Sequence, residues 1–232
     1  MVAALAAGAA AGSGIGYVLQ RGQLCFHSMF ASALAGRTLL LRGWLLGVAV
    51  TSVGLSLLYL TPWSRGLNTG LPFTPVSDIV GGLVIGAGMV VASSCASGLF
   101  YKLGSGMLGA LAGLAGWVAG ELAVRHLHLP GGSRFGASTV GASASVASGS
   151  PNWWLIAFLL AIVAGAAIAA RTAGGWQLRG ETPVRYGRLA AGGFLLGAGG
   201  WIAGGCNLGH GLSGTAQLNV SSWVVVASMA AG

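Results

Sequence analysis

The chain has 232 residues, of which 55% are hydrophobic and only 6% are charged, and its mean hydropathy is +0.81. An average protein has roughly 25% charged residues, so this chain has too little polar surface to coat a water-soluble globule. Its formal charge of +8 comes from 11 Lys and Arg residues scattered between apolar runs. This scatter argues against a basic face that binds nucleic acid. It is typical of basic residues that set the orientation of helices in the membrane, so we expect an all-α integral membrane protein.

Apolar runs that approach the length of a membrane span, about 20 residues, predict the helices. In chain order they cover residues 3–19, 39–60, 79–92, 104–124, 153–170 and 189–203. A seventh run begins at Trp223 and reaches Gly232 after about half the length of a span, so we expect the C-terminal helix to be incomplete. The first run has no basic start and is followed by further spans, which predicts a spanning helix rather than a cleaved signal peptide.

The segment 131–152 is rich in Gly, Ser and Ala and predicts a linker between two halves. We therefore expect a first membrane repeat over residues 1–130 and a second over 153–232 that is incomplete at its C-terminus. The connection 171–188 carries four Arg and one Glu. If the helices alternate in direction, the positive-inside rule places this connection, with Arg37 and Arg42, in the cytoplasm.

An internal repeat is the most informative feature of the sequence. Residues 81–98 and 192–209 are identical at eight of eighteen aligned positions, with no gap. The shared positions include Cys95 and Cys206. With alternating helices the two copies enter the membrane from opposite sides, which predicts the inverted repeats from which many transporters are built.

A third, weaker copy of the repeat lies near the N-terminus, where Gly12, Gly16 and Cys25 have the same spacing as Gly82, Gly86 and Cys95. It gives all three cysteines of the chain related surroundings.

The apolar stretch before each repeat cysteine is short. From residue 79 it lasts until Ala92, which is about 21 Å of helix against a hydrocarbon core of about 30 Å. Small residues around Cys95 and Cys206 are suited to an unwound segment, so we expect discontinuous helices that stop inside the membrane. Non-helical backbone at that depth is tolerated only where it is buried in protein or lines a cavity.

Three thiols with no close pair argue against a disulfide framework. A neutral thiol is polarizable and a weak donor, so it can hydrogen-bond a soft anionic sulfur. We therefore predict that the cysteines line a path for a small sulfur-containing anion. Three alternatives stay open: a redox or persulfide-handling protein with a reactive Cys25 beside Arg21 and His27, a soft-metal channel that adds histidines, and a purely structural role.

The segments RGQLCFHSMF, SSCASGLFYKLGSG and GGCNLGHGLSG resemble the three cysteine motifs of the YeeE/YedE family of bacterial thiosulfate transporters. This resemblance covers most of the chain. It implies an hourglass-like helical protein in the bacterial inner membrane that is not an enzyme and uses no cofactor. It also implies a relay in which thiosulfate passes between Cys25, Cys95 and Cys206 through transient S–H···S hydrogen bonds. Because Cys95 lies at the first break, we expect it to be the central station, with Cys25 and Cys206 on either side.

The same resemblance implies sulfur import for cysteine synthesis, commonly with a small cytoplasmic sulfur-carrier or rhodanese-type partner. Because some members are linked to other reduced sulfur or selenium species, such a substrate is the alternative to thiosulfate.

Five further residues are candidates for contact with the substrate. Arg21 could draw the anion to the mouth of the path, or extend to the membrane interface. Asn207 and His210 could donate to anion oxygens, or satisfy backbone carbonyls freed at the break. Gly98 and Gly209 end the two copies of the repeat and would let the backbone approach the anion.

Overall fold

The structure is a computed structural model that describes residues 2–61, 73–127 and 153–232. Within these ranges every regular element is a helix, apart from an isolated bridge between Met107 and Arg179. This confirms the predicted all-α class. The elements are α1 (Val2–Gly22), α2 (Phe26–Leu34), α3 (Leu39–Tyr59), α4 (Pro75–Ala92), α5 (Ala96–Gly104), α6 (Gly109–His126), α8 (Trp153–Thr172), α9 (Pro183–Ala203), the π-helix η3 (Gly209–Gly214) and α10 (Val220–Ala231).

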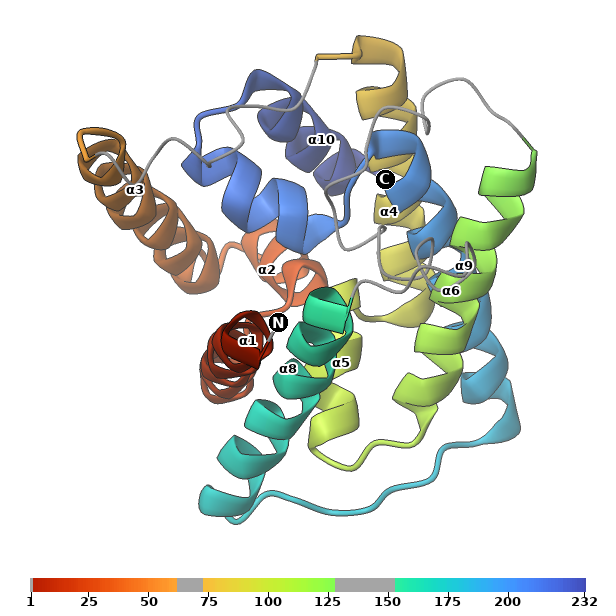
Figure 1. Cartoon of the computed structure of the whole chain (residues 1–232). Helices are drawn as coiled ribbons and strands as arrows, with labels where there is room; N and C mark the ends of the chain where they lie inside the picture. Colours follow the sequence, from red (N-terminus) through yellow and green to blue (C-terminus); the bar gives the residue numbers. More distant parts are fainter. Residues whose placement is uncertain (1, 62–72, 128–152) are drawn as a thin grey trace.

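Figure 1 shows how these elements are grouped. Helix α9 packs between α4 and α6, α1 lies along α8, and α10 covers the upper part of α4. Helix α3 stands apart at the left of the view, and only 11% of its most apolar stretch is buried. Most of the surface of α3 is therefore left to face lipid.

Three helical stretches are long and apolar enough to cross a membrane within the described residues: Leu39–Tyr59, Pro75–Gly104, which joins α4 and α5, and Trp153–Thr172. The sequence predicted six full runs. The long helices α1, α6 and α9 do form, but they are not among the three stretches that are apolar enough to count as spans.

Helices α4 and α9 end at Ala92 and Ala203, as predicted, but both start earlier than expected. Each begins with a proline, Pro75 or Pro183, at a first-turn position where the missing N–H costs nothing. Their 18 and 21 residues correspond to about 27 and about 31 Å. The predicted length of about 21 Å was wrong because the polar first turns were not counted.

Glycines four residues apart bring pairs of helices into backbone contact. A Cβ at Gly193 would collide with the carbonyl oxygen of Gly113, and one at Gly197 with that of Trp117, so α9 and α6 touch directly. In lipid there is little hydrophobic drive between helices, and close packing at small residues holds them together. Gly12 and Gly16 of α1 contact the α8 backbone in the same way, at Phe158 and Ile162. Gly82 and Gly86 of α4 contact the α10 backbone at Val225 and Met229.

Helices α4 and α9 meet through a reciprocal contact. A Cβ at Gly81 would lie 2.5 Å from the nitrogen of Ala203, and a Cβ at Gly192 would lie 2.5 Å from the nitrogen of Ala92. Gly81 and Gly192 match in the sequence repeat, as do Ala92 and Ala203. The two helices therefore run antiparallel, and the cysteine turns that follow them approach each other from opposite ends of the pair.

Replacing Gly16 should test the role of these glycines in packing. We expect Gly16→Leu to lower the free energy of unfolding by about 1–3 kcal/mol, because the side chain would be forced against the α8 backbone at Ile162, which cannot rotate away. The midpoint of thermal unfolding in detergent measures this change. Gly14→Leu is the control on the same helix, since a Cβ there meets nothing within 4 Å; equal melting temperatures for both variants would contradict the packing role.

Candidate functional site: three cysteine turns

Each cysteine ends a turn in which one helix stops and the next begins. The residue two positions before the cysteine has left-handed backbone, with φ of 49° at Gln23, 48° at Ser93 and 74° at Gly204. One residue separates it from the cysteine, and a helical segment resumes directly after the cysteine. We call residues 23–25, 93–95 and 204–206 the three cysteine turns.

The three cysteine turns also share their hydrogen bonds. The residue before the cysteine donates to a carbonyl five residues back in the preceding helix, as in a Schellman motif. This bond satisfies one of the carbonyls left free at the helix end. The donor-to-acceptor distances are 3.3 Å from Leu24 to Leu19, 3.1 Å from Ser94 to Met89 and 2.8 Å from Gly205 to Gly200.

Cys25 and Cys95 are in direct contact. Their sulfurs lie 3.3 Å apart, and their exposed fractions are 1% and 0%. The amide of Phe26 donates to the Cys95 sulfur at 3.3 Å, and the amide of Cys95 donates to the Cys25 sulfur at 3.4 Å. The first cysteine turn and the second are therefore joined through their sulfurs.

Donors from the first turn of α5 complete the surroundings of Cys95. The Gly98 amide donates to its sulfur at 3.4 Å, and the Ser97 hydroxyl lies 3.0 Å from it. The N-termini of α2 and α5 thus both point at this pair of sulfurs. Amides at a helix N-terminus favour negative charge, so this site can stabilise an anionic sulfur without a basic side chain.

Asn207 connects the third cysteine turn to the second. Its Oδ1 accepts from the amide of Ala96 at 3.3 Å, and its Nδ2 donates to the Ser97 hydroxyl at 3.1 Å. Asn207 directly follows Cys206, which is buried with 3% exposure. The fold therefore brings the segments of all three cysteines to one polar cluster in the interior.

Gly98 and Gly209 differ in their surroundings. A Cβ at Gly98 would lie 2.5 Å from the Ser94 hydroxyl and 3.1 Å from the Cys25 sulfur, so only glycine fits between these groups. A Cβ at Gly209 would meet nothing within 4 Å. The close approach of the backbone to the sulfurs thus depends on Gly98.

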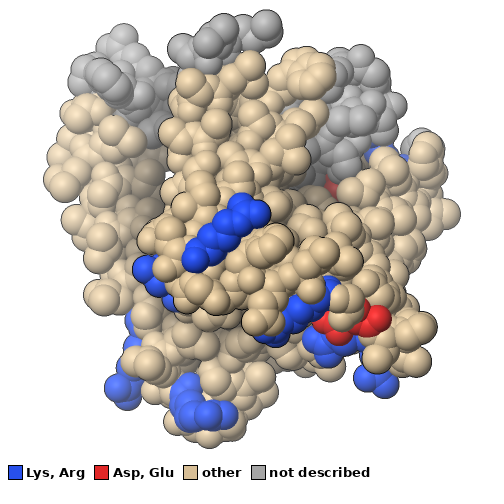
Figure 2. Space-filling model, turned by 90° about the horizontal axis from the view of Figure 1, so that it is seen from below, with Lys and Arg blue, Asp and Glu red and all other residues tan. Residues whose placement is uncertain are grey.

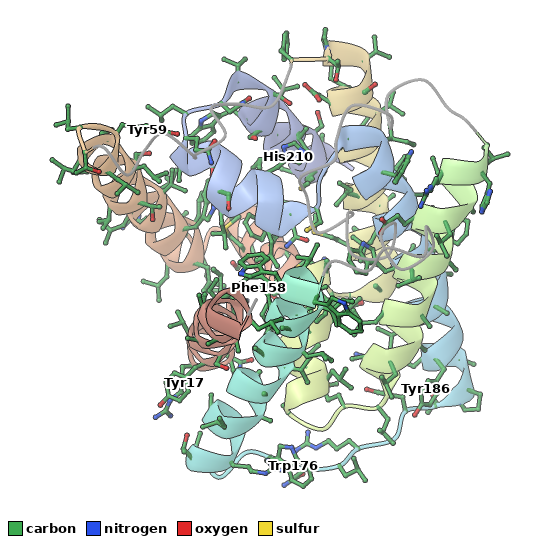
Figure 3. The ribbon with its side chains drawn as sticks, in the orientation of Figure 1. Tyr17, Tyr59, Phe158, Trp176, Tyr186 and His210 are labelled. Atoms are coloured by element: carbon green, nitrogen blue, oxygen red, sulfur yellow. The ribbon has the colours of Figure 1, made fainter. Side chains whose placement is uncertain are left out.

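His210 is buried on η3, with both ring nitrogens engaged (Figure 3). Its Nε2 lies 3.0 Å from the carbonyl oxygen of Ala203, the last residue of α9, and its Nδ1 lies 3.0 Å from the Ser222 hydroxyl. This is the predicted contact with a freed backbone carbonyl. Among the residues that the structure describes, no group of three His, Cys, Asp or Glu side chains is arranged to hold a metal ion.

Arg21 lies in the last turn of α1 and is exposed. Its guanidinium carbon is 5.8 Å from the centre of the Tyr17 ring, within the range of a cation–π contact. The structure therefore gives Arg21 a surface position beside Tyr17, which Figure 3 labels on the outer side of α1.

Two aromatic residues that the sequence did not single out contact η3, the helical segment that follows the third cysteine turn. Trp44 of α3 donates from Nε1 to the carbonyl oxygen of Gly211 at 2.6 Å. A Cβ at Gly211 would collide with the ring of Phe26, the residue after Cys25. The Phe26 and Trp44 rings pack edge to face at 6.1 Å. A single sequence gives no signal for contacts between such distant residues.

The chain matches the family described as sulphur transport over residues 21–162 and 131–232. It belongs to this family. This confirms the predicted family and makes the protein a membrane transporter of a sulfur-containing substrate rather than an enzyme.

Three relatives show how far this likeness extends. A thiosulfate transporter TsuA of Spirochaeta thermophila is 28% identical, over 90% of this chain and 91% of its own length. A thiosulfate transporter TsuA of Escherichia coli is 28% identical over 56% of this chain and 37% of its own. A probable transporter YedE of Escherichia coli is 30% identical over 42% of this chain and 23% of its own.

The contact between the Cys25 and Cys95 sulfurs can be tested by oxidation. We expect copper phenanthroline to link Cys25 to Cys95, because their sulfurs already lie 3.3 Å apart. Gly98→Ala should lower the yield, since the added methyl group pushes against both Ser94 and Cys25. Mass spectrometry of the peptides measures the yield, and Gly209→Ala is the matched control. Equal yields in the two variants, or linkage mainly to Cys206, would contradict this geometry.

Proposed function

We propose that this protein carries thiosulfate across the bacterial inner membrane in steps between Cys25, Cys95 and Cys206. The observation that carries the proposal is the buried sulfur pair, Cys25 and Cys95, at 3.3 Å, onto which backbone amides converge. Two relatives with the printed name thiosulfate transporter support the choice of substrate.

Thiosulfate suits such a site because it is a dianion with one soft terminal sulfur and three hard oxygens. A thiol can donate its S–H to the terminal sulfur and keep the site neutral. The amides of Phe26, Cys95 and Gly98, which now reach the cysteine sulfurs, would then donate to the anionic sulfur as it passes. Several weak contacts of this kind favour passage, since a transported ion must also be released.

Cys95 is the central station in this proposal because its sulfur has contacts from both sides. It touches the Cys25 sulfur directly, and it touches Ser97, which Asn207 connects to the Cys206 turn. The substrate would therefore meet Cys95 between the other two thiols. Asn207 and Ser97 would serve as neighbouring donors to the anion oxygens. Gly98 and Gly209 would let the backbone approach the anion. His210 would fix the third cysteine turn, and Arg21 would attract anions at the surface.

The architecture proposed with this function is an hourglass-like pair of inverted repeats with discontinuous helices. The reciprocal contacts of Gly81 and Gly192 support it, because an interface repeated in both directions is the signature of a two-fold axis. The common backbone of the three cysteine turns supports the discontinuous helices. The proposed repeats cover residues 1–130 and 153–232, and the proposed linker, 131–152, lies outside the described residues.

Basic side chains support a multi-pass topology with one cytoplasmic face. Figure 2 shows Lys and Arg spread over the face seen from below, with a group of acidic atoms beside them at the lower right. The connection after α8 runs along this end of the molecule in Figure 1 and holds Arg171 over the Trp176 ring, 4.6 Å from its centre. We place this face in the cytoplasm, where an acidic surface of a small sulfur-carrier or rhodanese-type protein could dock.

Growth on thiosulfate tests the relay. In bacteria that lack their own sulfate and thiosulfate importers, we expect the wild-type chain to support growth on thiosulfate as sole sulfur source. Cys95→Ser should abolish this growth, because a hydroxyl is a harder and less polarizable partner for sulfur. Ser56→Ala is the control, as Ser56 is exposed on α3 and its hydroxyl donates to the carbonyl oxygen of Ser52 in the same helix.

Full growth with correctly inserted Cys95→Ser protein would rule out the relay. If the wild-type chain inserts but gives no growth, the substrate is another species, and reduced sulfur and selenium anions are the next candidates. A persulfide-handling protein would instead show labelled sulfur bound covalently to a cysteine.

A further inference from the structure

An open cavity of about 490 Å³, lined by more apolar than polar surface, lies beside α2, outside the cluster formed by the cysteine turns. Its polar lining consists of His27, Ser28 and Ser32 of α2 and of Arg37, and leucines at the start of α3 supply the apolar part.

The end of α2 builds one wall of this cavity. Gly36 has φ of 78°, a left-handed conformation that favours glycine. The amide of Arg37 then donates back to the carbonyl oxygen of Ser32 at 2.8 Å, and that of Gly36 to Ala33 at 3.0 Å. These are the bonds of a Schellman motif. The turn folds Arg37 back onto the last turn of α2, so that it lines the same cavity as Ser32.

The charge of the lining selects an anion. The cavity has an arginine, a histidine and two hydroxyls, and none of the chain's three acidic residues, Asp78, Glu121 and Glu181, lines it. A guanidinium group presents parallel N–H donors that match two oxygens of an oxyanion. His27 and Ser28 lie in the first turn of α2, where the helix dipole also favours negative charge.

Two residues of the cavity lining lie close to Cys25 along the chain. His27 and Ser28 follow Cys25 by two and three residues, and the Cys25 sulfur touches that of Cys95. We infer that this cavity is a binding station for the oxygen end of the substrate at the Cys25 end of the relay. The inference rests on the proposed function. The cavity would hold a tetrahedral oxyanion by its oxygens, whereas the cysteines recognise the soft sulfur.

This division of roles has a consequence for sulfate. Sulfate has the same charge as thiosulfate and the same hard oxygens, so it should compete for the cavity. It has no terminal sulfur for the thiols to recognise, so it should not be carried across the membrane.

Equilibrium dialysis of the purified full chain in detergent, with radiolabelled thiosulfate, tests the binding station. We expect Arg37→Gln to weaken binding by about tenfold to a hundredfold, the loss typical of a hydrogen bond to a charged group. Unlabelled sulfate should displace thiosulfate from the wild-type protein. Arg42→Gln, an exposed position on α3 outside the cavity, is the matched control and should bind as the wild type does.

A second variant separates loss of the site from misfolding. Ala31→Trp fills the cavity from an exposed position on α2 without removing a charge. It should reduce binding while the protein keeps its melting temperature. Equal binding by Arg37→Gln, Ala31→Trp and Arg42→Gln would overturn the inference.

Uptake by wild-type proteoliposomes, measured in parallel, distinguishes this inference from the proposed function. If thiosulfate is taken up but binding does not depend on Arg37, the cavity is wrong and the relay stands. If binding depends on Arg37 but no thiosulfate is taken up, the relay is wrong and the oxyanion site stands. A wild-type protein that neither binds nor carries thiosulfate would overturn both.

Discussion

The structure depends on backbone contact between helices at glycine. Lipid supplies little hydrophobic drive between helices, so they are held by close packing. Gly81 and Gly192 let α4 and α9 approach until the backbone of each touches the other. A side chain at either position would push the helices apart and displace Ala92 and Ala203, the residues from which the second and third cysteine turns start. The contact between the Cys25 and Cys95 sulfurs also relies on a glycine, because a Cβ at Gly98 would lie 3.1 Å from the Cys25 sulfur.

The cysteine turns place backbone amides around the buried sulfurs. A left-handed residue ends one helix, and the cysteine stands where the next helix presents its free amides. Sulfur is large and polarizable and accepts these amides at 3.3 to 3.4 Å. In the proposed function the cluster around Cys25 and Cys95 would bind the soft sulfur of the anion, and the cavity with Arg37 would offer charge and hydroxyls to its hard oxygens. Recognition of both ends of one small anion would exclude anions that have only one of these properties.

Sequence patterns predicted the ends of α4 and α9 correctly, because a run of small residues around a cysteine interrupts an apolar stretch. The same patterns missed the starts at Pro75 and Pro183, because the first turns of these helices contain polar residues and so lie outside the apolar run. The short segments after each cysteine were missed for a related reason. With only nine residues each in α2 and α5, they are far below the length of about 20 residues that identifies a span.

The sequence by itself determined the helical membrane class, the family, and the matched positions of Cys25, Cys95 and Cys206, since composition and motif spacing are local properties of the chain. Only the tertiary structure decided that the Cys25 and Cys95 sulfurs touch and that Asn207 bonds to the α5 turn. These contacts join residues 70 and 111 positions apart. They follow from how closely the helix backbones pack, and hydropathy or spacing along one chain does not encode that distance.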